Sequence, residues 1–145
     1  MHLAQANVAS MRAGYDDPLM AEFMAQLDAV NATADTAPGF VWRLVEDDDG
    51  AEVQRVFGDD KLLFNMSVWK SVEALEDYVY KTRHVDVMRK RAKWFTRPIK
   101  PPFALWWIEA GHIPTVEEAK ARLEMLWASG PSPDAFTFAR RFPAP

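Results

Sequence analysis

The sequence contains no cysteine. This absence excludes disulfide bonds, thiolate-bound zinc and a cysteine nucleophile, and it is compatible with a reducing compartment. The chain also lacks any run approaching the roughly 20 apolar residues of a membrane-spanning helix, and its first residues lack the basic and apolar regions of a secretory signal. We therefore expect a soluble, cytoplasmic protein without a membrane partner.

Basic residues are outnumbered by acidic ones. The chain has 17 Lys and Arg against 21 Asp and Glu, which gives a formal net charge of -4 at pH 7. Proteins that bind a phosphate backbone usually carry a basic face, so nucleic acid is not an expected partner. The sequence also lacks a glycine-rich phosphate loop, a nucleophile elbow and a short metal-ligand spacing, and it therefore predicts no nucleotide site and no metal site.

Apolar and aromatic residues are, by contrast, abundant. Hydrophobic residues make up 49% of the 145 residues, and they include six Trp and nine Phe. This is enough material for one hydrophobic core. We expect a single domain over residues 1–145, with an ordered core at 3–138 and a C-terminal tail at 139–145.

Hydrophobic periodicity and capping signals predict the order strand, helix, strand, strand, helix, strand, helix. Strands are expected at 3–8, 40–45, 62–69 and 103–109, with a weak extended piece at 52–57 and an edge strand or swapped arm at 136–138. Helices are expected after the N-cap residues Asp17, Ser71 and Thr115, and Glu118 completes a capping box with Thr115. The order favours an α+β fold with a ferredoxin-like antiparallel sheet and helices on one face. Because the other face needs cover, we expect a homodimer that forms a dimeric α+β barrel.

Polar side chains share one face of the expected sheet. Successive residues of a strand point to opposite faces, so Asn65, Ser67 and Trp69 lie together, opposite the apolar residues that alternate with them. Gln5 and Asn7 form a similar set on the first strand. We expect the apolar set to meet the helices and the polar set to line a hollow between two subunits. A slip of one residue in register would exchange the two faces.

The second and fourth strands add candidate ligand contacts to this polar face. Arg43 either binds an anionic group or pairs with Glu109, which shares a strand phase with Trp107. Trp69 and Trp107 could form flat walls for an aromatic ligand. The alternative is that both rings only pack in the core or in a subunit interface.

His84 is the sequence's candidate for acid–base chemistry, because the ordinary pKa of a histidine lies near neutrality. Tyr80 and Met88 flank it on one helical face, four residues before and after. The alternative is a histidine at the edge of an apolar stripe that bonds only to backbone or water. Asn65 could donate a hydrogen bond to a substrate carbonyl or a developing oxyanion, or instead bond across strands within a dimer.

Several motifs along the chain together resemble a known family. They are Asn65-x-Ser67-Val68-Trp69, Tyr78-Val79-Tyr80-x-Thr82-x-His84, Trp94-Phe95, Leu105-Trp106-Trp107 and Gly111-His112-x-Pro114-Thr115. The resemblance is to the uncharacterised bacterial domain-of-unknown-function family 3291, and it extends from Leu3 to Phe138. It implies the dimeric α+β barrel class, which also contains antibiotic-biosynthesis monooxygenases, haem-degrading oxygenases, chlorite dismutase-like proteins and isomerases. Such a fold leaves the reaction open, and the resemblance transfers no catalytic residue.

These observations lead to one main hypothesis and two alternatives. The main hypothesis is a small-molecule enzyme that binds a hydrophobic or aromatic substrate and carries out monooxygenase-like or proton-transfer chemistry without a cofactor. In it, His84 moves the proton, Asn65 stabilises the oxyanion, and the aromatic side chains exclude water. The first alternative is a noncatalytic ligand-binding or dimerisation module. The second is a haem protein with His84 as the axial ligand.

Overall fold

The computed structural model describes residues 1–45, 51–83 and 89–145. Its strands are β1 (His2–Ser10), β2 (Phe40–Arg43), β3 (Leu62–Trp69) and β4 (Phe103–Ile108). Its α-helices are α1 (Ala21–Ala32), α2 (Ala51–Phe57), α3 (Val72–Thr82) and α5 (Val116–Ser129). Short 3-10 helices occupy Pro18–Met20, Thr33–Thr36 and Arg91–Lys93. Within the described ranges, no helix combines the length and the apolar character that crossing a bilayer requires.

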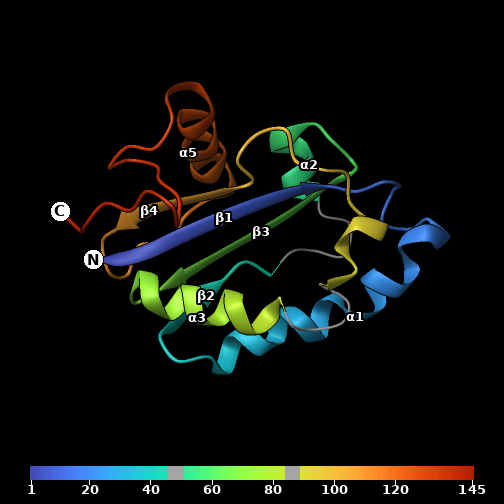
Figure 1. Ribbon diagram of the computed structural model, residues 1–145, viewed down its shortest axis with the longest axis horizontal. Helices are drawn as coiled ribbons and strands as arrows, with labels where there is room; N and C mark the ends of the chain where they lie inside the picture. The colour runs from blue at the N-terminus through green and yellow to red at the C-terminus, as the bar shows by residue number, and fades with distance from the viewer. Residues whose placement is uncertain (46–50, 84–88) are drawn as a thin grey trace.

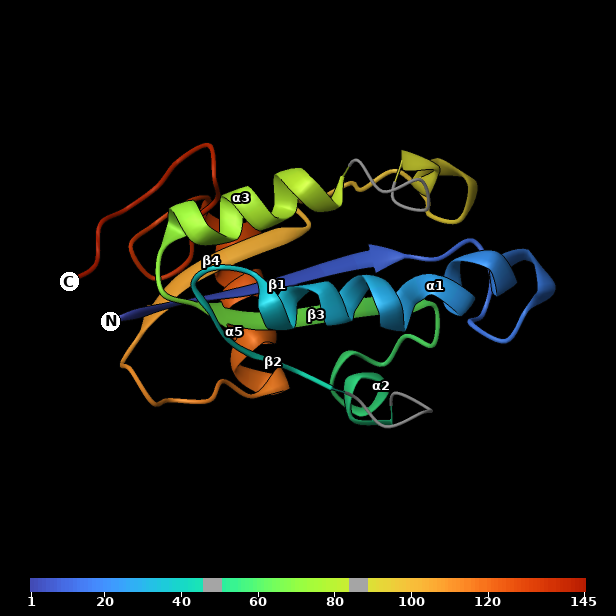
Figure 2. The same ribbon diagram turned by 90° about the horizontal axis from the view of Figure 1, so that it is seen from below.

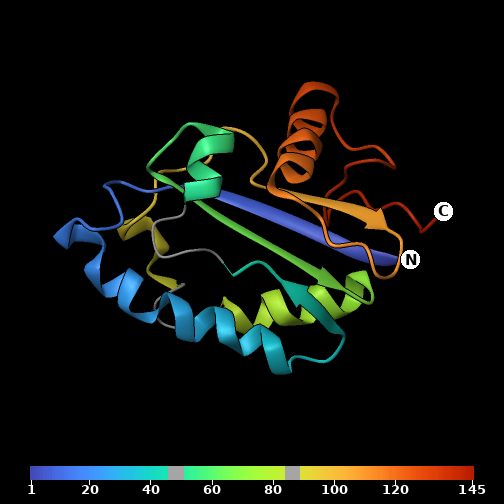
Figure 3. The ribbon, with the colours of Figure 1, turned by 180° about the vertical axis from the view of Figure 1, so that it is seen from behind.

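The four strands form one antiparallel sheet in the order β2-β3-β1-β4. With α1 between β1 and β2 and α3 between β3 and β4, this is the ferredoxin-like topology, and the expected α+β class is confirmed. Helices α1 and α3 lie together on one face of the sheet (Figures 1 and 2). The additional helices α2 and α5 lie on the other face, as the view from behind also shows (Figure 3).

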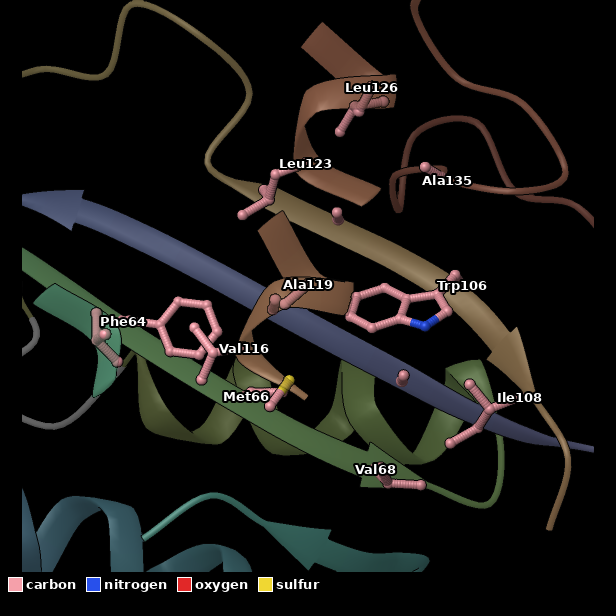
Figure 4. Close-up of a cluster of buried hydrophobic side chains, with 14 residues drawn as sticks. Phe64, Met66, Val68, Trp106, Ile108, Val116, Ala119, Leu123, Leu126 and Ala135 are labelled. Carbon is pink, nitrogen blue, oxygen red and sulfur yellow. The ribbon is translucent and has the colours of Figure 1, made fainter. Parts of the chain in front are cut away.

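The apolar phase of the sheet packs against α5 and α2 (Figure 4). Met66 and Val68 of β3 and Trp106 of β4 are buried there, under Leu123 and Leu126 of α5. The spacing of three between these two leucines brings both to one side of the helix, which is why this side of α5 is apolar. This face of the sheet is therefore filled by side chains of the same chain.

The start of α5 is fixed by hydrogen bonds that the sequence only partly predicts. Thr115 Oγ1 accepts from the backbone N–H of Glu118 at 3.1 Å, as expected of an N-cap residue. The Glu118 carboxylate then accepts from Trp106 Nε1 at 2.9 Å and from His112 Nε2 at 2.7 Å. These bonds tie the first turn of α5 to β4 and to the loop that precedes the helix.

The structure differs from the sequence-based expectation at residues 52–57 and defines the contact made by residues 136–138. Residues 52–57 are helical rather than extended, because Val53, Val56 and Phe57 have the helical spacing of three and four and pack against the same core as α5. The 136–138 segment forms a single bridge, in which Phe136 and Leu105 exchange two backbone hydrogen bonds of 2.8 Å. This bridge covers part of the outer edge of β4.

An irregularity in β2 changes which of its residues face α1 and α3. Strict alternation would place Phe40 and Trp42 on the same face. The register instead pairs Phe40 with Trp69 and Trp42 with Val68, so the two β2 residues face opposite sides of the sheet. Arg43 pairs with Ser67 and keeps its expected place on the polar face.

The approach of β2 to α3 makes Gly39 a sensitive position. Gly39 has φ +82° and an added Cβ would lie 2.5 Å from Ala74 Cβ, whereas Gly58 has φ +70° and nothing within 4 Å. We expect Gly39→Ala to lower the free energy of unfolding by about 2 to 4 kcal/mol, because backbone strain and overpacking add. Gly58→Ala introduces only the backbone strain of a positive φ and should lower the free energy of unfolding by only about 1 kcal/mol. Denaturant titration of both variants measures this, and equal losses would contradict the steric contact.

The Glu118 contacts predict a pH dependence. Burial raises the pKa of Glu118, but its hydrogen bonds with His112 and Trp106 outweigh burial, so the pKa lies below its ordinary value. A lowered folded-state pKa stabilises the fold above the ordinary glutamate pKa, and this contribution is lost as the pH falls through the lowered value. Relative to Glu118→Gln, the wild type should be more stable at neutral pH by up to about 1 kcal/mol. Unfolding curves at neutral and acidic pH should show this difference disappear in acid; a constant difference would contradict the assignment.

Candidate functional site

A cavity of about 630 Å³ lies between the sheet and helices α1 and α3. Its floor is the polar face of β1 and β3, and its opposite walls come from Phe23, Leu27 and Val30 of α1 and Tyr78 and Val79 of α3. The arrangement of these two helices over the sheet is visible in Figure 2. The cavity therefore lies within one chain, on the face that carries the ferredoxin-like helices.

This position corrects the expected facing of the strands. Asn65 and Ser67 line the cavity beneath the chain's own α1 and α3, not a surface turned away from them. The alternation in β3 is as predicted, but the apolar phase is buried by α5 and α2, which lie on the opposite side. Sequence alternation defines two faces but does not say which helices cover each face. The expected homodimer remains a prediction.

Strand register brings four amide and hydroxyl side chains together on the floor. In the β1–β3 pair, Asn7 lies opposite Asn65, and Gln5 lies opposite Ser67. Side chains directly opposite each other on neighbouring antiparallel strands are close enough to interact. The pattern Gln5-x-Asn7 facing Asn65-x-Ser67 is the sequence signal for this cluster.

The four side chains and one indole form a continuous hydrogen-bonded network. Gln5 Nε2 donates to Asn65 Oδ1 at 2.8 Å and to Ser67 Oγ at 2.7 Å. Asn7 Nδ2 donates to Gln5 Oε1 at 3.1 Å and to Asn65 Oδ1 at 3.3 Å. Trp69 Nε1 donates to Ser67 Oγ at 2.8 Å. Gln5 and Ser67 are the buried polar residues among those that the structure describes, and the network compensates the cost of burying them.

Asn65 Nδ2 is one of the donors that this network leaves without an acceptor among the described residues. The Asn65 oxygen is occupied by Gln5 and Asn7, while its Nδ2 group has no partner among the described residues. The residue is half-buried and lines the cavity. Hydrogen-bond donors aimed at developing negative charge can stabilise an oxyanion in a site that excludes water. The chemistry expected of Asn65 from the sequence is compatible with this position.

Arg43 also lines the cavity, but it does not pair with Glu109. Arg43 Nε donates to Asp35 Oδ1 at 2.8 Å and Nη2 to Oδ2 at 3.4 Å. The hydrogen bond lowers the pKa of Asp35 and raises that of Arg43, so both groups stay charged. Glu109 is exposed just beyond β4, at the opposite edge of the sheet from β2. The expected pair required adjacent strands, and the strand order separates them.

The two tryptophan candidates lie outside the cavity lining. Trp69 is fully buried beside Ser67 on the same strand face and packs against Tyr78, with ring centroids 5.1 Å apart, so its ring is covered by the protein instead of facing a ligand. Trp107 Nε1 donates to the backbone oxygen of Phe142 at 2.9 Å. Both rings thus follow the packing alternative.

The structure places one of the candidate residues expected on the helix after Ser71, Tyr80, and does not describe the other two, His84 and Met88. Tyr80 is 60% exposed and is not part of the lining, whereas Tyr78, which was not a candidate ligand contact from the sequence, lines the cavity and donates to the Val30 oxygen at 3.2 Å. His84 and Met88 lie outside the described residues. In the part of the chain that the structure does describe, no group of three His, Asp or Glu side chains is placed to hold a metal ion.

The network makes Ser67 a test of the floor's integrity. Ser67→Ala should lower the free energy of unfolding by about 2 to 4 kcal/mol, because the N–H donors of Gln5 and Trp69 lose their acceptor in a buried place. The matched control is Ser10→Ala, at an exposed position where the hydroxyl makes no hydrogen bond to the described residues. It should stay within about 0.5 kcal/mol of the wild type. Equal stability of the two variants in urea titration would contradict the network.

A family model and several solved structures match this chain. The family described as Domain of unknown function (DUF3291) matches residues 2–145. No curated protein matches the chain. Among solved structures, SnoaB from Streptomyces nogalater, a cofactor-independent oxygenase, is similar with 18% identity and a TM-score of 0.46, covering 74% of this chain and 93% of its own. A mutant of SnoaB is similar at 16% identity and TM-score 0.48, covering 79% and 98%. A putative antibiotic biosynthesis monooxygenase from Chloroflexus aurantiacus is similar at 13% identity and TM-score 0.45, covering 77% and 97%.

Proposed function

We propose that this chain, which belongs to the family described as Domain of unknown function (DUF3291), is a small-molecule enzyme that acts on a hydrophobic or aromatic substrate. The observation that carries the proposal is the Nδ2 donor of Asn65, which lies on the floor of the cavity under α1 and α3 and has no partner among the described residues. The cavity volume of about 630 Å³ suits a small organic ligand, because such sites typically measure about 300 to 1,000 Å³.

The walls and the floor of the cavity favour different parts of such a substrate. Met24, Leu27 and Val79 offer apolar surface, which gains free energy when it is covered by an apolar ring system. The floor offers the Asn65 amide to a carbonyl oxygen of the same molecule. This pairing of an apolar wall with a few placed polar groups is typical of sites that orient a ligand.

The proposed reaction begins with removal of a proton from carbon next to, or conjugated with, that carbonyl. Negative charge then develops on the carbonyl oxygen, where the Asn65 amide stabilises it. Reprotonation at another carbon gives an isomer. Reaction with O₂ converts a CH₂ group to C=O and releases one water, which is a monooxygenation. His84 stays the proton carrier proposed from the sequence.

Two alternatives share the same cavity. A noncatalytic binding module would use the same apolar walls and the same amide donor without turnover. The haem alternative depends on His84 alone, since no histidine of the described ranges lines the cavity. We therefore assign no step to haem.

The test uses anthrone, a flat aromatic ketone with an acidic CH₂ conjugated to its carbonyl. Oxygenation consumes one O₂ per anthrone and yields anthraquinone and water, so O₂ uptake and product absorbance can be followed together against spontaneous oxidation. Asn65→Asp should slow turnover by about 100-fold or more, because the Nδ2 donor is replaced by a carboxylate oxygen that repels the oxyanion. Its carboxylate still accepts from Gln5 and Asn7, so the floor should remain folded.

The matched control is Gln26→Glu on α1, an exposed position outside the cavity lining that brings the same change in net charge. It should keep the wild-type rate. Binding of anthrone without O₂ uptake would favour the noncatalytic module. Wild-type protein that neither binds nor oxidises anthrone, or turnover that survives Asn65→Asp, would contradict the proposed chemistry.

A further inference from the structure

The polarity of the cavity floor depends on one side chain of β1. We propose that Gln5 is a positioning residue: it orients Asn65 and Ser67 so that the β3 side of the floor presents hydrogen-bond donors only. The site then selects aromatic ligands with an oxyanion end, such as a carboxylate or an enolate, over ligands that offer only N–H donors. This inference rests on the proposed small-molecule function and adds its selectivity.

Gln5 is held in one place by its burial and by its bonds. It is 2% exposed, and each hydrogen of its Nε2 group has an acceptor, Asn65 Oδ1 at 2.8 Å and Ser67 Oγ at 2.7 Å. Its Oε1 accepts from Asn7 Nδ2 at 3.1 Å. A side-chain amide carries two donor hydrogens on nitrogen and an acceptor oxygen, so the Gln5 nitrogen has no hydrogen to spare.

Ser67 can offer only a donor to the cavity. A hydroxyl accepts through two lone pairs, and Ser67 Oγ accepts from both Gln5 Nε2 and Trp69 Nε1. The indole N–H can only donate, so Ser67 cannot donate to Trp69. The Ser67 hydrogen has no acceptor among the described residues and is available to a ligand.

Asn65 is constrained in the same way. Its Oδ1 accepts from Gln5 and Asn7, which turns the Nδ2 group away from β1. Asn65 and Ser67 are two residues apart on β3, so their free donors lie on the same face of the strand. A ligand oxygen between them can accept from both.

Strand β2, which lies on the other side of β3 from Gln5, adds the guanidinium group of Arg43, whose charge is paired with Asp35. Arg43 of β2 lies opposite Ser67 in the register and lines the cavity, and its hydrogen bond to Asp35 raises its pKa. The acidic residues of the lining, Asp28, Asp59 and Asp60, are all exposed. Asn7 Oδ1, an acceptor of the network that has no donor among the described residues, belongs to β1, on the other side of β3 from Arg43. An oxyanion placed over β3 toward β2 thus meets the donors of Asn65 and Ser67 and the guanidinium of the Arg43–Asp35 pair.

Two probes with the same ring system test the selectivity. 2-Naphthoate presents an oxyanion, and 2-naphthylmethylammonium presents only N–H donors. Dissociation constants of both at neutral pH, measured by calorimetry, give one ratio for each protein variant. We expect the wild type to prefer naphthoate by about tenfold or more, since charge-assisted hydrogen bonds are the stronger ones.

Gln5 variants should change that ratio, not merely weaken both probes. In Gln5→Glu, the new carboxylate accepts from Ser67 and Asn65 and adds negative charge, so the preference should invert. In Gln5→Met, an apolar chain of similar length, Asn65 and Ser67 lose their fixed orientation, and the ratio should fall toward one. Gln26→Glu again controls for net charge and should keep the wild-type ratio.

The outcomes separate this inference from the proposed function. Wild-type preference for the ammonium probe overturns the assigned polarity, and this measurement needs no variant to fold. A wild-type ratio retained in folded Gln5→Met and Gln5→Glu overturns the role of Gln5 alone. Failure of both probes and of anthrone to bind the wild type contradicts the proposed function, and the inference falls with it.

Discussion

The structure depends on satisfying a carboxamide that is buried between the two central strands. An unpaired amide in an apolar interior costs several kcal/mol, so Gln5 can be buried only if every donor and acceptor around it is arranged to meet it. Ser67 and Asn65 provide acceptors, and Asn7 provides a donor. The partners stand in register because β1 and β3 pair without interruption from Leu3 to Ser10. The same constraint that stabilises the central pair therefore fixes which atoms remain for a ligand.

The two faces of the sheet meet different demands. The face under α5 is filled by apolar side chains such as Met66 and Trp106, and packing there can be close. The face under α1 and α3 carries the polar network near its middle and apolar clusters on either side, around Trp69 and around Phe23. The apolar side chains of α1 and α3 would gain little free energy by packing directly onto the amide groups of this network. This mismatch accounts for a cavity on one face and a filled core on the other.

Much of the fold could be predicted from local patterns. The bounds of β3 agree with the alternation at 62–69, and Asp17, Ser71 and Thr115 accept the hydrogen bonds expected of N-cap residues. These features depend on neighbouring residues, so the sequence contains their cause. The members of the polar cluster could be predicted for the same reason, since strand alternation alone groups Asn65 with Ser67.

The sequence-based predictions that were wrong depended on how elements far apart in the sequence are arranged in space. The pairing of Arg43 with Asp35 instead of Glu109 follows from the strand order, which places β2 and β4 at opposite edges. The face of the sheet on which α5 packs becomes the filled core. Hydrophobic periodicity does not predict which face that is. The irregularity in β2 puts Phe40 on the opposite face from Trp42, because a local change in register exchanges faces across it; Trp42 and Arg43 keep their expected faces and Phe40 does not.

The site combines a rigid floor with a roof that is held by fewer bonds. The floor belongs to the central strands β1 and β3, each paired on both sides, so its donors are positioned before a ligand arrives. The roof consists of α1 and α3, and Tyr78 links them by donating to the Val30 oxygen at 3.2 Å. Beside the floor, on the same strand face as Ser67, Trp69 packs against Tyr78 and donates to Ser67 at 2.8 Å. The Tyr78–Trp69 ring contact and the Trp69–Ser67 hydrogen bond thus form a continuous chain of contacts from α3 to the hydroxyl of Ser67 on the floor.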